Sequence, residues 1–167
     1  ISNSTVMVSQ YNVPTLLEKT LDTDQGLQLL DRDGNTSALF PKGTVLSAAY
    51  ASQDGNSLVV QTSGGGEENA IYRFDDLWGD TASQVLAQGN GLFLLDASSD
   101  LSILLYTLPG DTGDACDYYA LRAGKAPVLL VQGNESAVVT MDNTILFSAD
   151  GGTRLLLSDG TDVPISL

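Results

Sequence analysis

The chain has 167 residues, and its seven Lys and Arg side chains stand against twenty-one Asp and Glu, which gives a net charge of −14 at pH 7. Such a surface repels phosphate backbones and anionic lipids, so we expect no nucleic acid partner. No apolar run approaches the roughly 18 residues of a membrane-spanning helix, so we expect no membrane insertion. The length is typical of one domain with a sizeable core.

The first 40 residues predict an incomplete group of strands. Residues 4–10 resemble a second strand, residues 26–31 a third, and residues 37–40 a fourth. The connection over residues 11–25 is long, and its segment 15–19 is compatible with a helical turn or an extra strand. We therefore expect this first group to lack its first strand, or to receive it from elsewhere.

The next segment predicts four short strands in succession. Its apolar runs are rich in β-branched residues and are separated by clusters of Gly, Asp and Asn, which favour tight turns. Gaps of hairpin size imply antiparallel neighbours, and so a four-stranded meander. The expected strands cover residues 45–51, 57–62, 70–75 and 83–87.

Two weaker copies of this unit follow. An Asp marks the turn before each second strand, at Asp54, Asp100 and Asp142. The copies recur at roughly 40 to 45 residues with four strands each, a spacing typical of propeller blades. The third unit is expected over residues 92–96, 102–108, 118–122 and 128–132, and the fourth over residues 136–141, 144–148, 153–158 and 163–167.

The predicted fold class is all-β: a β-propeller or partial propeller of about four four-stranded antiparallel blades, the first incomplete, forming a single domain over residues 1–167. An ordinary β-sandwich is the alternative, but it does not explain why all four strand positions recur together. Because propellers close rings of four to eight blades, three arrangements are open. The chain is part of a longer propeller, or two copies associate into one ring, or four blades close alone; the first two are favoured.

One turn and one strand resemble a known repeat. Ser52-Gln53-Asp54-Gly55 is similar to the Ser-Pro-Asp-Gly motif of TolB-type propeller repeats, and residues 70–75 are similar to their third strand, of the form Ile-Tyr-x-x-Asp. The motif's Pro is absent, and Ala51 stands where a Trp usually precedes it. The resemblance implies a propeller fold. Such blades occur in periplasmic scaffolds, lipoproteins and the gating domains of prolyl-oligopeptidase-like peptidases.

The composition removes most catalytic chemistry. The chain has no His, which excludes Ser-His-Asp and Cys-His catalysis and histidine metal ligation. Cys116 is the only cysteine, and Lys19, Lys42 and Lys125 lie in no nucleophile motif. We therefore predict no catalytic, cofactor-binding or metal-binding residues, no cofactor, and a protein that is not an enzyme.

Two weaker features remain as candidates. Asp111, Asp114 and Asp117 place three carboxylates within seven residues, and calcium prefers six to eight oxygen ligands on a flexible loop. Asp residues that cap their own backbone in a turn explain the same cluster and are favoured. Trp78, in a predicted loop, is a type enriched at interfaces, although packing against a neighbouring blade is the more favoured interpretation.

These observations predict a non-catalytic structural or protein-interaction module that self-associates, as a homodimer or larger assembly, or belongs to a larger chain. The alternatives are the propeller domain of an exported hydrolase or peptidase, and a calcium-stabilised carbohydrate-binding propeller. Three matches to the glycosylation acceptor pattern, at Asn3, Asn35 and Asn134, hint at export. We therefore expect an extracytoplasmic or secreted location.

Overall fold

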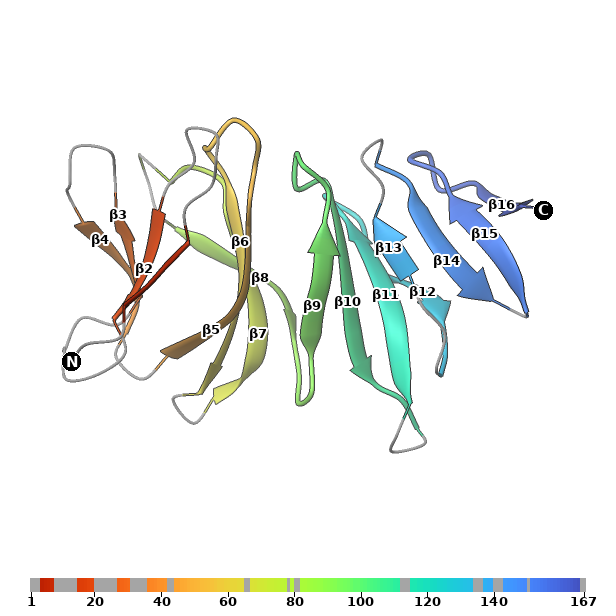
Figure 1. Ribbon diagram of the computed structural model, residues 1–167, viewed down its shortest axis with the longest axis horizontal. Helices are drawn as coiled ribbons and strands as arrows, with labels where there is room; N and C mark the ends of the chain where they lie inside the picture. Colours follow the sequence, from red (N-terminus) through yellow and green to blue (C-terminus); the bar gives the residue numbers. More distant parts are fainter. Residues whose placement is uncertain are drawn as a thin grey trace. The chain divides into compact units, whose positions relative to one another are not determined.

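The computed structural model describes residues 4–7, 15–19, 27–30, 36–41, 44–64, 67–77, 79, 82–111, 115–133, 137–139, 143–149 and 151–165. These residues form strands, turns and bends without helix, so none of them belongs to a helix able to cross a membrane. The chain divides into two compact units, Ile1–Gln88 and Gly89–Leu167, each with two four-stranded antiparallel sheets (Figure 1). The all-β class and the four-strand repeat are confirmed; the single domain over residues 1–167 stays a prediction.

The first sheet corrects one expectation. It has four strands in sequence order: β1 (Ser4–Met7), β2 (Thr15–Lys19), β3 (Leu27–Leu30) and β4 (Thr36–Phe40). The prediction that this group lacks its first strand was wrong, because β2 is a strand that pairs with both β1 and β3. Residues 4–7 are therefore the first strand of the sheet rather than the second.

The second sheet agrees with the sequence pattern. Its strands lie in sequence order: β5 (Thr44–Ala51), β6 (Leu58–Gly64), β7 (Glu67–Phe74) and β8 (Ser83–Gln88). Each strand begins and ends within a few residues of its predicted bounds.

The first unit is held together by apolar side chains between its two sheets. Alternate residues of a strand point to opposite faces, and Leu58, Val60 and Phe74 share the face that packs against the first sheet. From that sheet, Phe40 meets Tyr72 and Phe74 edge-on, with ring centroids 4.9 and 5.7 Å apart. Such edge contacts add specificity to the burial of apolar area.

The second unit repeats this plan. Its first sheet comprises β9 (Phe93–Ala97), β10 (Ile103–Pro109), β11 (Cys116–Arg122) and β12 (Val128–Val131). Its second sheet comprises β13 (Ala137–Val139), β14 (Ile145–Ala149), β15 (Gly152–Leu156) and β16 (Asp162–Ile165). Both sheets are therefore complete four-stranded meanders, as predicted.

One apolar cluster joins the two sheets of this unit. Ile103, Ala120 and Val131 of the β9–β12 sheet pack with buried side chains of the β13–β16 sheet. The latter are Ile145, Phe147 and Leu156, which the strand pairing places on a single face. The opposite face of the β13–β16 sheet therefore points away from this core.

Two of the three predicted Asp turns, at Asp54 and Asp100, lie within the described residues and share one geometry, whereas Asp142 lies outside the described residues. In the 52–57 turn, the Ser52 hydroxyl donates to Asp54 at 2.5 Å and accepts the Ser57 N–H at 2.9 Å. In the 98–103 turn, the Ser98 hydroxyl donates to Asp100 at 2.7 Å and accepts the Ile103 N–H at 2.9 Å. This agreement confirms that the two turns are copies of one motif.

Candidate functional site

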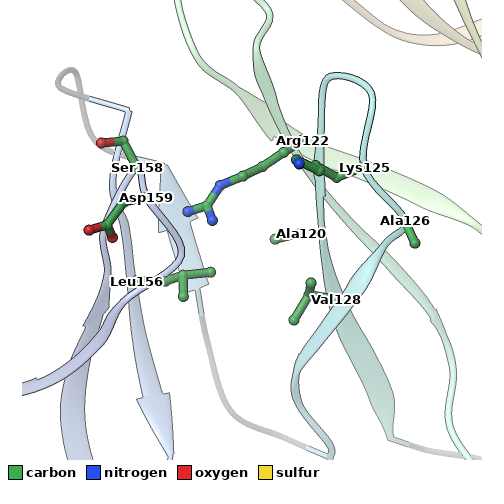
Figure 2. Close-up of a pocket in the computed structure, with 8 residues that line it drawn as sticks. All are labelled: Ala120, Arg122, Lys125, Ala126, Val128, Leu156, Ser158 and Asp159. Carbon is green, nitrogen blue, oxygen red and sulfur yellow. The ribbon is translucent and has the colours of Figure 1, made fainter.

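A pocket of about 380 Å³ lies between the two sheets of the second unit (Figure 2). One wall is β11, the turn that follows it and the start of β12; the other is the end of β15 and the β15–β16 turn. Both walls belong to the same unit, so the pocket is a feature of that unit alone. Its lining residues are Ala120, Arg122, Lys125, Ala126 and Val128 on one side, and Leu156, Ser158 and Asp159 on the other.

The apolar part of the pocket follows from the alternation of the strands. Ala120 and Arg122 are two residues apart on β11 and so face the same way, towards the β13–β16 sheet. Leu156 reaches towards Val128 from the opposite side (Figure 2). Val128 is 52% exposed, so an apolar wall of the pocket is open to solvent.

Arg122 crosses from one sheet to the other. Its Nη2 donates to the Leu157 carbonyl oxygen, and a Cβ placed on Gly160 would lie 3.3 Å from its Nη1. Its Nε is buried and has no hydrogen-bond partner within the described part of the chain. An unpaired buried donor is unfavourable by about 1–3 kcal/mol, and the described contacts leave this cost at Arg122 uncompensated.

Tight turns position the remaining polar side chains. The Lys125 N–H donates to the Arg122 carbonyl oxygen at 3.0 Å and closes the turn that carries the lysine. In the facing turn, the Thr161 N–H donates to Asp159 Oδ1 at 2.7 Å. This hydrogen bond, and more weakly the charge of Arg122, hold the pKa of Asp159 below its ordinary value. Asp159 is therefore a carboxylate at neutral pH.

The electrostatic character of the pocket differs from that of the chain. Arg122 and Lys125 are two of only seven basic residues, and Asp159 is the one acidic residue of the lining. The lining is thus one charge positive in a chain of net charge −14. The other two described arginines are neutralised, since Arg73 pairs with Asp75 at 2.6 Å and Arg154 with Asp162 at 2.9 Å.

Most of the candidate residues from the sequence analysis do not line this pocket. Asp111 is exposed after β10 and Asp117 lies near the start of β11, whereas Asp114 is outside the described residues, as is Trp78. Within the described ranges no three His, Cys, Asp or Glu side chains come close enough to hold a metal ion. Calcium binding by Asp111, Asp114 and Asp117 stays a prediction, because Asp114 lies outside the described residues. Cys116 is exposed and unpaired with any other cysteine.

Sequence reasoning identified no part of this pocket. Lys125 was considered only as a nucleophile, Arg122 and Ser158 only as the ends of predicted strands, and Asp159 was not considered as a binding residue. The rarity of basic residues was the one available signal, because two of the seven stand only three positions apart. Nothing in the pattern placed them opposite a turn more than thirty residues later.

Comparison with known proteins supports the fold. No protein-family profile and no curated protein match the chain. Among solved structures, TolB from Acinetobacter baumannii has a TM-score of 0.59 at 17% identity, covering 92% of this chain and 41% of that one. An acylaminoacyl peptidase from Pyrococcus horikoshii has a TM-score of 0.61 at 11% identity, covering 99% and 33%. The match to an oligogalacturonate lyase in complex with manganese has a TM-score of 0.56 at 15% identity, covering 93% and 45%.

These similarities confirm the propeller class and the resemblance to TolB. At identities below 20% they establish the fold and nothing of the chemistry. The chain spans less than half the length of the proteins that it matches.

Proposed function

We propose that the chain is a non-catalytic structural module, located outside the cytoplasm, that supplies blades to a larger propeller assembly by binding a second copy of itself. The likeness to TolB supports the module and its location. The observation that carries the proposal is the open face of the β13–β16 sheet.

A continuous aliphatic row crosses that face. The strand pairing aligns Val138 with Leu146, Leu146 with Leu155, and Leu155 with Val163, so each of the four strands contributes one residue. Directly opposite residues of an antiparallel sheet share a face. Val138 is 47% exposed and Val163 is 36% exposed, so the row is accessible at both edges of the sheet.

The same face carries no charge among the residues that the structure describes. A second row follows the pairing of Ser148, Thr153 and Ile165, and it is also neutral. In a chain with twenty-eight charged residues, a sheet face whose described residues carry no charge is typical of a surface that becomes buried. The reverse face of this sheet already packs against the β9–β12 sheet through aliphatic side chains and Phe147, so packing of a further sheet would continue an existing type of interface.

A second copy has the matching surface. A two-fold contact pairs a patch with itself, and an aliphatic row is complementary to another aliphatic row without any charge pairing. At physiological salt the Debye length is about 8 Å, so the net charge of each copy opposes association only weakly. We therefore expect a dimer at micromolar concentration.

The test is the mass in solution, measured by light scattering during size exclusion. The expected species has twice the 17.5 kDa of one chain. Val138→Lys should weaken the dimer at least tenfold, because it buries an unpaired ammonium. Val85→Lys is the matched control, since Val85 on β8 is also 47% exposed and the change in net charge is identical.

Two results would contradict the proposal. One is a folded wild-type monomer at every concentration tested. The other is equal weakening by Val138→Lys and Val85→Lys, because net charge rather than the open face would then control association.

A further inference from the structure

We infer that the pocket between the β9–β12 and β13–β16 sheets binds a small monocarboxylate with a short branched aliphatic body. The carboxylate lies at Arg122 and Lys125, and the body lies against Ala120, Val128 and Leu156. This inference is independent of self-association, because every residue that lines the pocket belongs to one unit.

The cationic end of the pocket favours an oxygen anion. Arg122 makes one described side-chain hydrogen bond, to the neutral carbonyl of Leu157, and its buried Nε has no described acceptor. A guanidinium presents a fork of N–H donors that matches a carboxylate. In the proposed complex the Arg122 side chain turns towards the pocket, so that the ligand carboxylate meets the fork and the unpaired donor gains an acceptor. Lys125, in the exposed turn beside it, adds a second positive charge.

The neighbouring acidic group limits the charge of the ligand. Asp159 remains ionised and lies on the wall opposite Lys125. With two cations and one carboxylate, the lining balances one negative charge and repels a second. Phosphate, which carries about 1.5 negative charges on average at neutral pH, is therefore disfavoured relative to a monocarboxylate.

The remaining lining residues determine the size and the apolar character of the ligand's aliphatic part. Half of the lining residues are Ala, Val or Leu, and a volume of about 380 Å³ is at the small end of ligand pockets. A body of about four to six carbon atoms buries against Ala120, Val128 and Leu156, and the removal of its methylenes from water favours binding. A compact branched chain fits a floor made of alanine and branched side chains.

Titration of the complete chain with 4-methylpentanoate, followed by amide chemical shifts in ¹⁵N-labelled protein, tests the inference. The shifts should be confined to the pocket, at Lys125, Ala126 and Ser158, with a dissociation constant in the millimolar range. 4-Methylpentanamide, which has the same body without the charge, should bind at least tenfold more weakly. Inorganic phosphate should also bind more weakly than the acid.

Variants separate charge from folding. Arg122→Gln should weaken binding of the acid at least tenfold, and Lys125→Gln about threefold. Arg73→Gln makes the same charge change at an arginine in the other unit, next to Asp75, and should leave binding unchanged. If Arg122→Gln disturbs the contact between the sheets, Lys125→Gln still reports on the site, because Lys125 is exposed in a turn.

Three results would overturn the inference. They are the absence of pocket shifts at tens of millimolar acid, equal binding of the acid and the amide, and tighter binding of phosphate than of the acid. Equal weakening by Arg73→Gln and Lys125→Gln would also overturn it, since binding would then follow net charge.

Discussion

The 52–57 and 98–103 turns have the same backbone conformation, but the residue that follows the Asp is a glycine in the first turn and a buried leucine in the second. In both, the residue after the Asp adopts a left-handed conformation, with φ of 74° at Gly55 and 56° at Leu101. Glycine reaches this region at little cost, whereas a leucine is strained by about 1–2 kcal/mol. Leu101 is 1% exposed, so burial of its side chain offsets the strain. The comparison teaches that a repeat can lose its most typical turn residue and keep the turn, provided that the replacement is buried.

The two turns also differ in their connections. Asp100 accepts a hydrogen bond from Asn143 Nδ2 at 2.9 Å, across to the turn that precedes β14. Asp54 accepts hydrogen bonds from Ser52 and Asn56 of its own turn. The carboxylate that closes the 98–103 turn therefore also ties together the two sheets of the second unit.

Substitution of Leu101 should have the largest effect. Leu101→Ala removes a buried side chain and keeps the strain, so we expect a loss of about 2–4 kcal/mol in the free energy of unfolding. Leu101→Gly loses the same side chain but relieves the strain, so it should be less destabilising than Leu101→Ala by about 1 kcal/mol. Urea unfolding followed by circular dichroism measures both.

The matched control is Gly55→Ala, which introduces at the 52–57 turn the strain that Leu101 already carries, at about 1–2 kcal/mol. At an ordinary strand position, by contrast, glycine stabilises the protein less than alanine does. If Leu101→Gly is as unstable as Leu101→Ala or more so, the left-handed backbone at Leu101 is not strained.

These turns also show how far the sequence could predict the structure. The recurrence of Asp54 and Asp100 before apolar runs was sufficient to locate both turns and the strands on either side. The loss of glycine at Leu101 suggested a degraded copy, because the burial of a side chain by a neighbouring sheet is not visible in a local pattern. The strand at Thr15–Lys19 was ambiguous for a related reason: its sequence suits a helical turn as well, and only pairing with β1 and β3 decides.

The pocket was beyond prediction because it depends on contacts between sheets. Arg122 ends a strand whose periodicity indicates a face, but the partner of that face is a turn at Asp159 in the next repeat. By contrast, the alternation of Leu146 and Leu155 with Ile145 and Leu156 makes both faces of the last sheet apolar, which is visible in the sequence. The pattern alone did not say which of the two faces is buried.

Removal of the Asp100 carboxylate should have the next largest effect. Asp100→Ala leaves the Ser102 N–H and the Asn143 amide without this acceptor, and leaves the Ser98 hydroxyl with its longer hydrogen bond to the Ile103 carbonyl oxygen, at 3.3 Å. We expect a loss of about 1–2 kcal/mol in the free energy of unfolding. Asp54→Ala should cost less, because Asp54 is fully exposed and its described hydrogen bonds stay within one turn. Urea unfolding of both variants gives the comparison, and equal losses would mean that the hydrogen bond to Asn143 contributes nothing.

The smallest expected effect is the pH dependence of the stability that the Asp100 and Asp54 carboxylates contribute. Partial burial by itself raises the pKa of Asp100, but the hydrogen bonds from Ser102, Ser98 and Asn143 outweigh it and hold that pKa well below its usual range. A carboxyl with a depressed pKa in the folded state stabilises the protein above its unfolded pKa of about 3.9, and this contribution is lost as the pH falls through the folded value.

Wild type should therefore have a higher free energy of unfolding than Asp100→Asn, and this difference should be largest at pH 6–7. Because the carboxyl is largely exposed, we expect a difference of about 1 kcal/mol or less. The difference should become smaller at pH 3. The pKa of Asp54 is lowered chiefly by the Ser52 hydroxyl, so Asp54→Asn should show the same direction with a smaller gap. Urea midpoints at pH 7, 5 and 3 measure both variants. A gap that is constant with pH for Asp100→Asn would mean that the carboxylate charge does not stabilise the turn, and that only its shape does.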